Sequence, residues 1–343
     1  MTPIRLALVG CGLVGKRHLE VIKASPEATL VSIADPSDEA QKLATDHGVF
    51  HGKALTDVLS ASSPDAVILA TPNAMHLPDA ETCIAAGLPV LVEKPLTDSV
   101  AAGERLVEAA QKASVPVLTG HHRRHHSLVR AAKDKIDEGA LGKLVTAHAT
   151  TWLMKPDHYF DVEWRRAASA GPVSINLIHD VDLLRHFCGD VVEVHAFASN
   201  TTRGFDAEDS ASIILRFASG ALGTMSLTDS VPAPWSWELT AKENPAYPPN
   251  DEICMMIGGT RGALEIPAAA IWSCPEERSW WAPIARQPLF RDSTDPFANQ
   301  LAHFCSVIRG DEEPRVTAQD GLAALKVIEA VKMSARTGQT VKL

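Results

Sequence analysis

Lys94 and His179 have side chains suited to moving a proton at a hydroxyl group. Lys94 follows the apolar run "PVLV" and Glu93 and precedes Pro95, so its ammonium stands at the end of a predicted strand. There it can donate to a substrate hydroxyl and lower the pKa of that group, with its own charge tuned by Glu93 and by desolvation. His179 lies in "SINLIHDVDLLRHF", and an imidazole titrates near pH 7, where it can accept the hydroxyl proton. The alternatives are a solvated lysine at a loop entrance and a structural histidine on an amphipathic helix.

Polar residues around His179 could orient its ring or hold a substrate. At helical spacing Asn176, His179 and Asp180 fall on one face, with Asp182 and Arg185 farther around the helix. A carboxylate or amide neighbour can fix the tautomer of an imidazole. We therefore expect Asn176 and Asp180 to contact the substrate beside His179.

Three glycines, Gly10, Gly12 and Gly15, separate the first apolar run from a charged, helix-like stretch. Such a turn alone is a weak signal, but Asp35 stands 20 residues after Gly15 at the end of the next apolar run, "TLVSIAD". This is the pattern of a dinucleotide site, with the pyrophosphate at the helix N-terminus and the aspartate on the adenosine ribose. The carboxylate of Asp35 would repel the extra phosphate of NADP, so we expect NAD. The alternative for Asp35 is a helix cap for the following "SDEAQ".

Two further strand ends should lie at the same edge of the sheet. "VILATPNAMH" ends at Thr71-Pro72-Asn73, with His76 three residues on, and "PVLVEKP" ends at Glu93-Lys94. In open α/β sheets ligands bind outside the carboxyl ends of the strands, so these residues should face the nicotinamide half of the cofactor. The expected cofactor-binding residues are Gly10, Gly12, Leu13, Val14, Gly15, Asp35, Thr71, Pro72, Asn73, His76, Glu93 and Lys94.

The segment "TTWLMKPDHYFDVEWRR", residues 150 to 166, combines aromatic and cationic side chains before the predicted catalytic helix. Lys155, Tyr159 and Arg165 in a binding role would favour a substrate that carries a carboxylate as well as hydroxyls. The alternative is a core loop with a solvated basic edge. In "GHHRRHH", Arg123 could also reach the cleft, and Arg124 could be a structural ion-pair partner. The expected substrate-binding residues are Asn176, Asp180, Lys155, Tyr159, Trp164, Arg165 and Arg123.

The elements that must position these residues change character along the chain. Up to about residue 120, continuous apolar strands alternate with helix-period segments, which predicts an α/β domain with a doubly wound parallel sheet. Later segments such as "SASIILRF", "ALGTMSLTDS" and "WSWELTA" alternate with period 2 and predict mainly antiparallel strands. We expect a dinucleotide-binding domain at residues 1–121 and a substrate-binding and oligomerisation domain at 122–343. The C-terminal helix could pack back onto the first domain.

Composition excludes several classes of protein. The formal net charge of the 343 residues is −10, which disfavours nucleic acid as a partner. Neither a membrane-spanning run nor a secretory leader is evident, so we expect a cytoplasmic location. The six scattered cysteines form no CxxC pair and indicate buried, reduced thiols. No metal is expected, because the histidines of "GHHRRHH" lack carboxylate or cysteine partners at ligand spacing.

The whole chain resembles the Gfo/Idh/MocA family of NAD(P)-dependent oxidoreductases. The motifs "GCGLVGKRHLE", "ATPNAMH", "AGLPVLVEKPLT", "AGPVSINLIHDVDLLRHFCG" and "EDSASIILRF" occur in the family's order. The resemblance implies a Rossmann domain and a second α/β domain whose large, mainly antiparallel open sheet mediates homodimers or homotetramers. It also implies that Lys94 and His179 are the catalytic pair. One departure is Ile175, at a position where members acting on sugars and cyclitols often carry an aspartate.

We therefore expect an NAD-dependent dehydrogenase that moves a hydride between the nicotinamide and a secondary alcohol or ketone carbon. The substrate class is a sugar, cyclitol or sugar acid, and NADP is the less favoured cofactor. One alternative is an enzyme of the same fold that cleaves or eliminates a glycoside while recycling bound NAD. Another is a non-catalytic sensor of NAD(H).

Overall fold

The structure, a computed structural model, describes residues 2–289 and 294–343. It divides into two compact units. The first comprises the described residues of Met1–His126 and Thr294–Leu325, and the second those of Ser127–Ser293 and Lys326–Leu343. The first unit is thus built from two separate stretches of chain.

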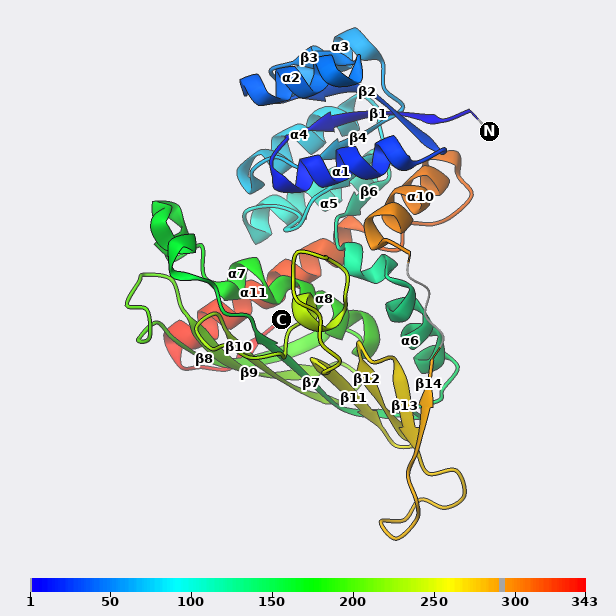
Figure 1. Ribbon diagram of the computed structural model, residues 1–343, viewed down its shortest axis with the longest axis vertical. Coiled ribbons are helices and arrows are strands. Elements are labelled where there is room, and N and C mark those ends of the chain that lie inside the picture. The colour runs from blue at the N-terminus through cyan, green and yellow to red at the C-terminus, as the bar shows by residue number, and fades with distance from the viewer. Residues whose placement is uncertain (1, 290–293) are drawn as a thin grey trace. The chain divides into compact units, whose positions relative to one another are not determined.

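The first unit contains a parallel six-stranded sheet in the order β3-β2-β1-β4-β5-β6 (Figure 1). The apolar strands are buried on both faces, which confirms the predicted doubly wound sheet. The three-residue strand β3 was not predicted, because its exposed Phe50 and half-buried His51 form no apolar run. The strands are β1 Ile4–Val9, β2 Ala28–Ala34, β3 Phe50–Gly52, β4 Ala66–Leu69, β5 Val90–Val92 and β6 Val117–Thr119.

Helices cover both faces of this sheet. Alternate residues of β1 enter two different cores: Leu6 and Leu8 pack with α1, α2 and α10, whereas Ala7 and Val9 pack with α3, α4 and α5. Residues 294–325 therefore supply part of one face, through Leu301 of α10. The helices are α1 Leu13–Ala24, α2 Asp38–His47, α3 Leu55–Ser62, α4 Asn73–Ala85, α5 Val100–Ala113 and α10 Pro296–Arg309.

The second unit contains a nine-stranded sheet in the order β14-β13-β12-β11-β7-β10-β9-β8-β15. Its pairings are antiparallel except for β7 with β10, which confirms the mainly antiparallel prediction. Strands β7 and β12 to β14 were not predicted: β7 (LVTAHATTW) is rich in alanine, threonine and histidine, and β12 to β14 are only four or five residues long. The strands are β7 Leu144–Trp152, β8 Val191–Ser199, β9 Ser210–Phe217, β10 Leu222–Thr228, β11 Met255–Gly259, β12 Gly262–Ile266, β13 Ala270–Ser273, β14 Ala285–Pro288 and β15 Val341–Lys342.

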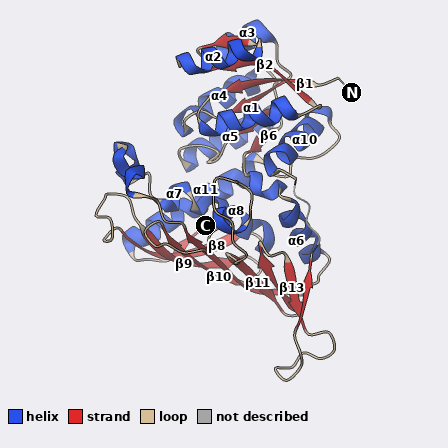
Figure 2. Ribbon diagram, in the orientation of Figure 1, coloured by secondary structure: helices blue, strands red, loops and turns tan. Residues whose placement is uncertain are grey.

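The helices of this unit gather on one face of the nine-stranded sheet (Figure 2). Two predicted elements are corrected. "WSWELTA" forms the short helix α9 (Trp237–Thr240) instead of a strand, and the helix expected around His179 is interrupted at Asn176. The remaining helices of this unit are α6 Ser127–Asp137, α7 Pro172–Ile175 and α8 Leu177–Cys188, with 3-10 turns η2 Asp157–Asp161 and η3 Glu163–Arg166. The helix α11 Ala318–Thr337 crosses the boundary between the two units, and the 3-10 turn η1 His122–His125 belongs to the first.

The opposite face of the nine-stranded sheet exposes apolar side chains. Along β9 the residues alternate, with Ile213 and Leu215 buried and Ile214 exposed. On the neighbouring β8, Phe197 is 67% exposed. Leu222, Met256 and Trp272 continue this open face across β10, β11 and β13. In the part of the chain that the structure describes, no helix is both long and apolar enough to cross a membrane.

Candidate active site

The glycine turn between β1 and α1 depends on the absence of side chains at two of its three glycines. Gly10 has φ +90°, and a Cβ there would lie 2.4 Å from the carbonyl oxygen of Ala70. A Cβ on Gly15 would lie 2.0 Å from the carbonyl oxygen of Gly10. A Cβ on Gly12 would meet nothing within 4 Å, so the N-terminus of α1 is open at that residue. Its unpaired amides form a suitable place for a phosphate.

Asp35, directly after β2, is hydrogen-bonded to this turn. Its Oδ2 accepts from the amide of Cys11 at 2.8 Å, and its Oδ1 accepts from the amide and hydroxyl of Ser37. Burial acts to raise the pKa of Asp35, but these hydrogen bonds outweigh it and hold the pKa below its ordinary value. The alternative role for Asp35, a cap of α2, is wrong: Ser37 is the N-cap and accepts from the amide of Ala40.

At the end of β4, Pro72 and Asn73 are exposed and Thr71 is half-buried. Asn73 begins α4, with Pro72 as its N-cap. His76 is only 1% exposed, and its two ring nitrogens each lie 2.9 Å from a backbone carbonyl oxygen, Nε2 from Thr71 and Nδ1 from Pro95. The imidazole therefore joins the segments that follow β4 and β5.

Glu93, directly after β5, is buried, and Lys94, the next residue, is half-buried. Glu93 Oε1 lies 2.7 Å from Nε2 of His18, and Oε2 accepts from the amide of Lys94 at 3.2 Å. Burial acts to raise the pKa of Glu93, but the hydrogen bond and charge of His18 outweigh it and lower the pKa. The sequence suggested that Glu93 tunes the Lys94 ammonium. In the structure the Glu93 carboxylate meets His18 and the Lys94 backbone, and the charge of Lys94 also contributes to the lowered pKa of Glu93.

His179 lies in the first turn of α8 and is buried. Asn176 is the N-cap of α8 and has helical backbone angles (φ −101°, ψ −49°), and its carbonyl accepts from the amide of His179 at 3.2 Å. The carboxylate of Asp180 accepts a hydrogen bond from the hydroxyl of Thr151 on β7, which anchors α8 to the sheet. Asn176 is half-buried, and its side-chain oxygen has no hydrogen-bond partner among the residues that the structure describes.

The aromatic and cationic segment after β7 forms a stack around Tyr159. The guanidinium carbon of Arg165 lies 4.2 Å from the ring centroid, and Nη1 of Arg165 donates to the Tyr159 carbonyl at 2.9 Å. The Lys155 ammonium lies 5.2 Å from the same centroid, and Trp164 is largely exposed. Burial raises the pKa of the Tyr159 hydroxyl and lowers the pKa of Lys155, which is only 9% exposed.

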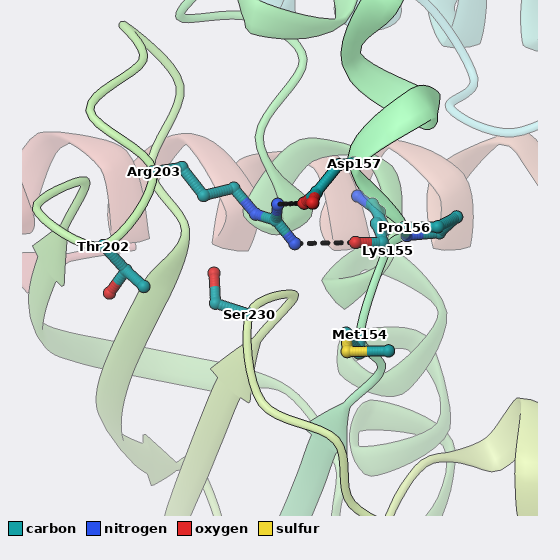
Figure 3. A pocket seen from close by; sticks show the side chains of 7 residues that line it. All are labelled: Met154, Lys155, Pro156, Asp157, Thr202, Arg203 and Ser230. Atoms are coloured by element: carbon teal, nitrogen blue, oxygen red, sulfur yellow. Dashed lines mark hydrogen bonds and ion pairs between the residues drawn. The ribbon is translucent and has the colours of Figure 1, made fainter.

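A pocket of about 450 Å³ opens at one edge of the nine-stranded sheet (Figure 3). β7, β8 and β10 run in the same direction, since β7 pairs parallel with β10, and β9 lies antiparallel between β10 and β8. Segments that follow the carboxyl ends of these three strands meet at the pocket. Its lining residues are Met154, Lys155, Pro156, Asp157, Thr202, Arg203 and Ser230.

Arg203 and Asp229 are residues of this pocket region that the sequence did not single out. Nε of Arg203 donates to Asp229 Oδ1 at 2.9 Å. Nη2 of Arg203 donates to the Lys155 carbonyl at 2.8 Å (Figure 3). Asp229 Oδ2 also lies 3.5 Å from Nζ of Lys155. Asp229 lies near the end of the predicted strand segment "ALGTMSLTDS", a position that could have identified it. Arg203 lies in an irregular loop, where only the fold reveals its partner.

Arg123 is buried in η1, which belongs to the first unit. The neighbouring Arg124 forms the predicted structural ion pair, with Nη1 3.3 Å from Oδ1 of Asp320. Within residues 2–289 and 294–343, no group of three histidine, cysteine, aspartate or glutamate side chains is arranged to hold a metal ion.

Comparison with known proteins gives matches over the whole chain. Residues 4–121 match the model described as "Oxidoreductase family, NAD-binding Rossmann fold", and residues 129–265 match the GFO/IDH/MocA C-terminal domain. Myo-inositol 2-dehydrogenase of Thermotoga maritima is 26% identical over 360 residues, which cover 99% of this chain and 98% of that protein. The 1,5-anhydro-D-fructose reductase of Ensifer adhaerens is 26% identical over 351 residues, covering 99% and 98%.

Solved structures agree with these matches. The WlbA dehydrogenase of Bordetella pertussis, in complex with NADH and UDP-GlcNAcA, superimposes with a TM-score of 0.79 at 26% identity. The alignment covers 100% of this chain and 99% of that chain. Aldose-aldose oxidoreductase of Caulobacter crescentus, complexed with glycerol, gives a TM-score of 0.81 at 25% identity and covers 100% of both chains.

Proposed function

This chain belongs to the GFO/IDH/MocA family of oxidoreductases, and we propose that it interconverts a secondary alcohol and a ketone on a sugar, cyclitol or sugar acid, with NAD as cofactor. The match of both family domains is the observation that carries this assignment. Relatives with near-complete coverage are named as dehydrogenases or reductases of such compounds. These names disfavour a glycoside-cleaving enzyme or a non-catalytic NAD(H) sensor.

The residues of the first unit fit an adenine dinucleotide. Gly10 and Gly15 allow the turn to close, and the open surroundings of Gly12 leave room for a pyrophosphate at the α1 N-terminus. Asp35 remains ionised because its pKa is lowered, so it can accept from a ribose diol and repel a 2′-phosphate. When bound, NAD accepts or returns the hydride of the alcohol carbon.

Lys94 and His179 are the proposed catalytic pair. The Lys94 ammonium donates to the substrate oxygen and stabilises the negative charge that develops there. His179 Nδ1 or Nε2 takes the hydroxyl proton during oxidation and returns it during reduction. Asp180 does not act as a second acid or base in this scheme, because Thr151 holds its buried carboxylate at the sheet.

Residues of the second unit are the proposed substrate contacts. Asn176 offers a hydroxyl its amide oxygen, which has no partner within residues 2–289 and 294–343, and Trp164 offers an exposed ring. Lys155, Tyr159 and Arg165 present cations around an aromatic face, an arrangement that suits a carboxylated sugar. The earlier assignment of Asp180 and Arg123 to substrate binding has weaker support, because Asp180 is bound by Thr151 and Arg123 is buried in η1.

We further propose that the protein is a homodimer or homotetramer that assembles through the open face of the nine-stranded sheet. Phe197, Ile214, Leu222, Met256 and Trp272 give this face an apolar character that favours burial against a second copy. A cytoplasmic location is also proposed. It is supported by the six cysteines, all of which are free.

A substrate panel tests the proposed function. Purified protein is incubated with NAD or NADP and with sugars, cyclitols or sugar acids, and absorbance at 340 nm is followed. Steady reduction of NAD with at least one compound is expected. Tight NAD binding together with inertness toward every compound, in both directions, would contradict the proposal.

A further inference from the structure

The segment Glu93-Lys94-Pro95 is held on both sides by buried histidines from different helices. His18 of α1 contacts Glu93, and His76 of α4 contacts Pro95. We propose that His18 and His76, here called the histidine clamp, are positioning residues that fix the backbone on either side of Lys94. This inference rests on the proposed function, in which the Lys94 ammonium acts on the substrate.

The first arm of the clamp is the pair formed by His18 and Glu93. His18 is 2% exposed and Glu93 6%, so the 2.7 Å contact between Nε2 and Oε1 is shielded from water. The lowered pKa of Glu93 keeps it a carboxylate, and a hydrogen bond to an ionised group is stronger than one between neutral groups. Phe297 of α10 covers the pair, with its ring centroid 5.4 Å from that of His18 in edge-to-face geometry.

The carboxylate of Glu93 connects His18 to the backbone of Lys94. Its second oxygen, Oε2, accepts from the Lys94 amide at 3.2 Å. Gly120, directly after β6, leaves the required room: a Cβ there would lie 2.9 Å from the carboxyl carbon of Glu93. His18 therefore acts on the Lys94 backbone through one buried side chain.

The second arm is His76. Its Nδ1 lies 2.9 Å from the Pro95 carbonyl, and its Nε2 lies 2.9 Å from the Thr71 carbonyl. Carbonyl oxygens only accept, so the ring makes both bonds as an imidazolium and one bond as a neutral imidazole. The carboxyl group of Asp79, one turn farther along α4, interacts electrostatically with this ring. His76 thereby ties the residue after Lys94 to the end of β4.

The two arms approach from opposite faces of the six-stranded sheet. α1 packs in the core that contains Leu6, whereas α4 packs in the core that contains Ala7. Each helix also begins at a segment assigned to the cofactor, α1 at the glycine turn and α4 at Asn73. The clamp consequently links the cofactor-binding segments to Lys94. A misplacement of about 1 Å at a reacting group can reduce a rate by about 10²-fold, so such a link has a measurable effect.

Hydrogen exchange tests the clamp without any substrate. We compare wild-type protein with His18→Leu and His76→Leu, which remove the donors, and with His18→Gln and His76→Gln, which keep an N–H donor. The matched control is His303→Gln. His303 is also a buried histidine of the first unit, but it bonds to Glu312 and the Arg315 amide, outside the Lys94 segment. Amides of residues 91–99 should exchange about tenfold faster in both leucine variants, less in the glutamine variants, and as in wild type in the control.

Kinetics with a substrate from the panel give the second measurement. In the leucine variants kcat should fall at least tenfold, while the KM for NAD changes less than about threefold and the glutamine variants recover part of the loss. His303→Gln should retain wild-type kcat. Unchanged exchange at residues 91–99, or kcat losses no greater than in the control, would overturn the clamp. Inertness of wild-type protein toward the panel would contradict the proposed function, and the exchange result would still decide the clamp.

Discussion

The carboxylate of Asp35 accepts a hydrogen bond from the Cys11 amide at 2.8 Å, so the end of β2 is joined to the glycine turn after β1. The residue proposed to select the cofactor is therefore also part of the turn that would hold the pyrophosphate. A substitution that keeps a hydrogen-bond acceptor but removes the charge separates these two roles.

Asp35→Asn should reduce the preference for NAD over NADP at least tenfold. The amide oxygen can still accept from Cys11, but the negative charge that repels a 2′-phosphate is gone. The preference is measured as the ratio of kcat/KM values for the two cofactors. Asp38→Asn, an exposed change in the first turn of α2, is the control. An unchanged ratio in Asp35→Asn would show that another group selects the cofactor.

Gly15→Ala and Gly12→Ala should have different effects. The new Cβ at Gly15 would lie 2.0 Å from the Gly10 carbonyl, whereas the one at Gly12 would meet nothing within 4 Å. Gly15→Ala should therefore lower Tm by several degrees, as a strained core substitution does. Gly12→Ala should keep the wild-type Tm and weaken NAD binding in calorimetry. Wild-type NAD affinity in a folded Gly12→Ala protein would argue against a pyrophosphate at this turn.

Lys94→Ala should lower turnover at least about a hundredfold, in the range typical of general acid–base groups, while NAD still binds. Lys112→Ala, on the exposed end of α5, should be without effect. The measurements are kcat with the best panel substrate and NAD affinity by calorimetry. Wild-type turnover in Lys94→Ala would remove this residue from the mechanism.

Lys155→Met should raise the KM of carboxylated substrates more than the KM of neutral polyols. Burial lowers the pKa of Lys155 from its ordinary value of 10.5, so this ammonium loses its proton at a lower pH than an exposed lysine. In wild-type protein, affinity for a carboxylate should thus decline as pH rises toward 10.5, and the methionine variant should lack that decline. Equal KM increases for charged and neutral substrates would contradict a carboxylate-binding role.

Ile214→Asp should shift the protein toward a smaller species. The side chain is exposed on the open face of the nine-stranded sheet, and a carboxylate there would be costly to bury against a second copy. Molar mass is measured by light scattering after gel filtration. Glu108→Lys on α5 of the first unit serves as the charge-change control. A monomeric wild-type protein would exclude the proposed assembly.

Local patterns in the sequence predicted much of the fold. Continuous apolar runs predicted β1 and β4, and period-2 alternation predicted β9. A strand buried on both faces is apolar throughout, whereas a strand buried on one face alternates between apolar and polar residues. The pattern failed at Asn176, since both halves of an interrupted helix keep helical spacing. It also failed at Trp237, where alternating aromatic and polar residues form a short helix.

Of the candidate site too, only a part could be predicted from the sequence. The glycine turn and the position of Asp35 beside it could be predicted, because the dinucleotide-binding pattern specifies the spacing of both. The contact of His18 with Glu93 spans 75 positions, and that of Arg203 with Asp229 spans 26. Neither pair has a periodic signal, since each depends on how separate elements pack.

Because residues 294–325 belong to the first unit, they restrict which recombinants between this protein and its relatives can fold. α10 covers the core around Leu6 and Leu8, yet it is encoded after most of the second unit. Recombination at the 126/127 junction alone would join one parent's sheet to another parent's covering helix. Viable chimeras should therefore need two further crossovers, near residues 293 and 325, so that both stretches of the first unit are inherited together.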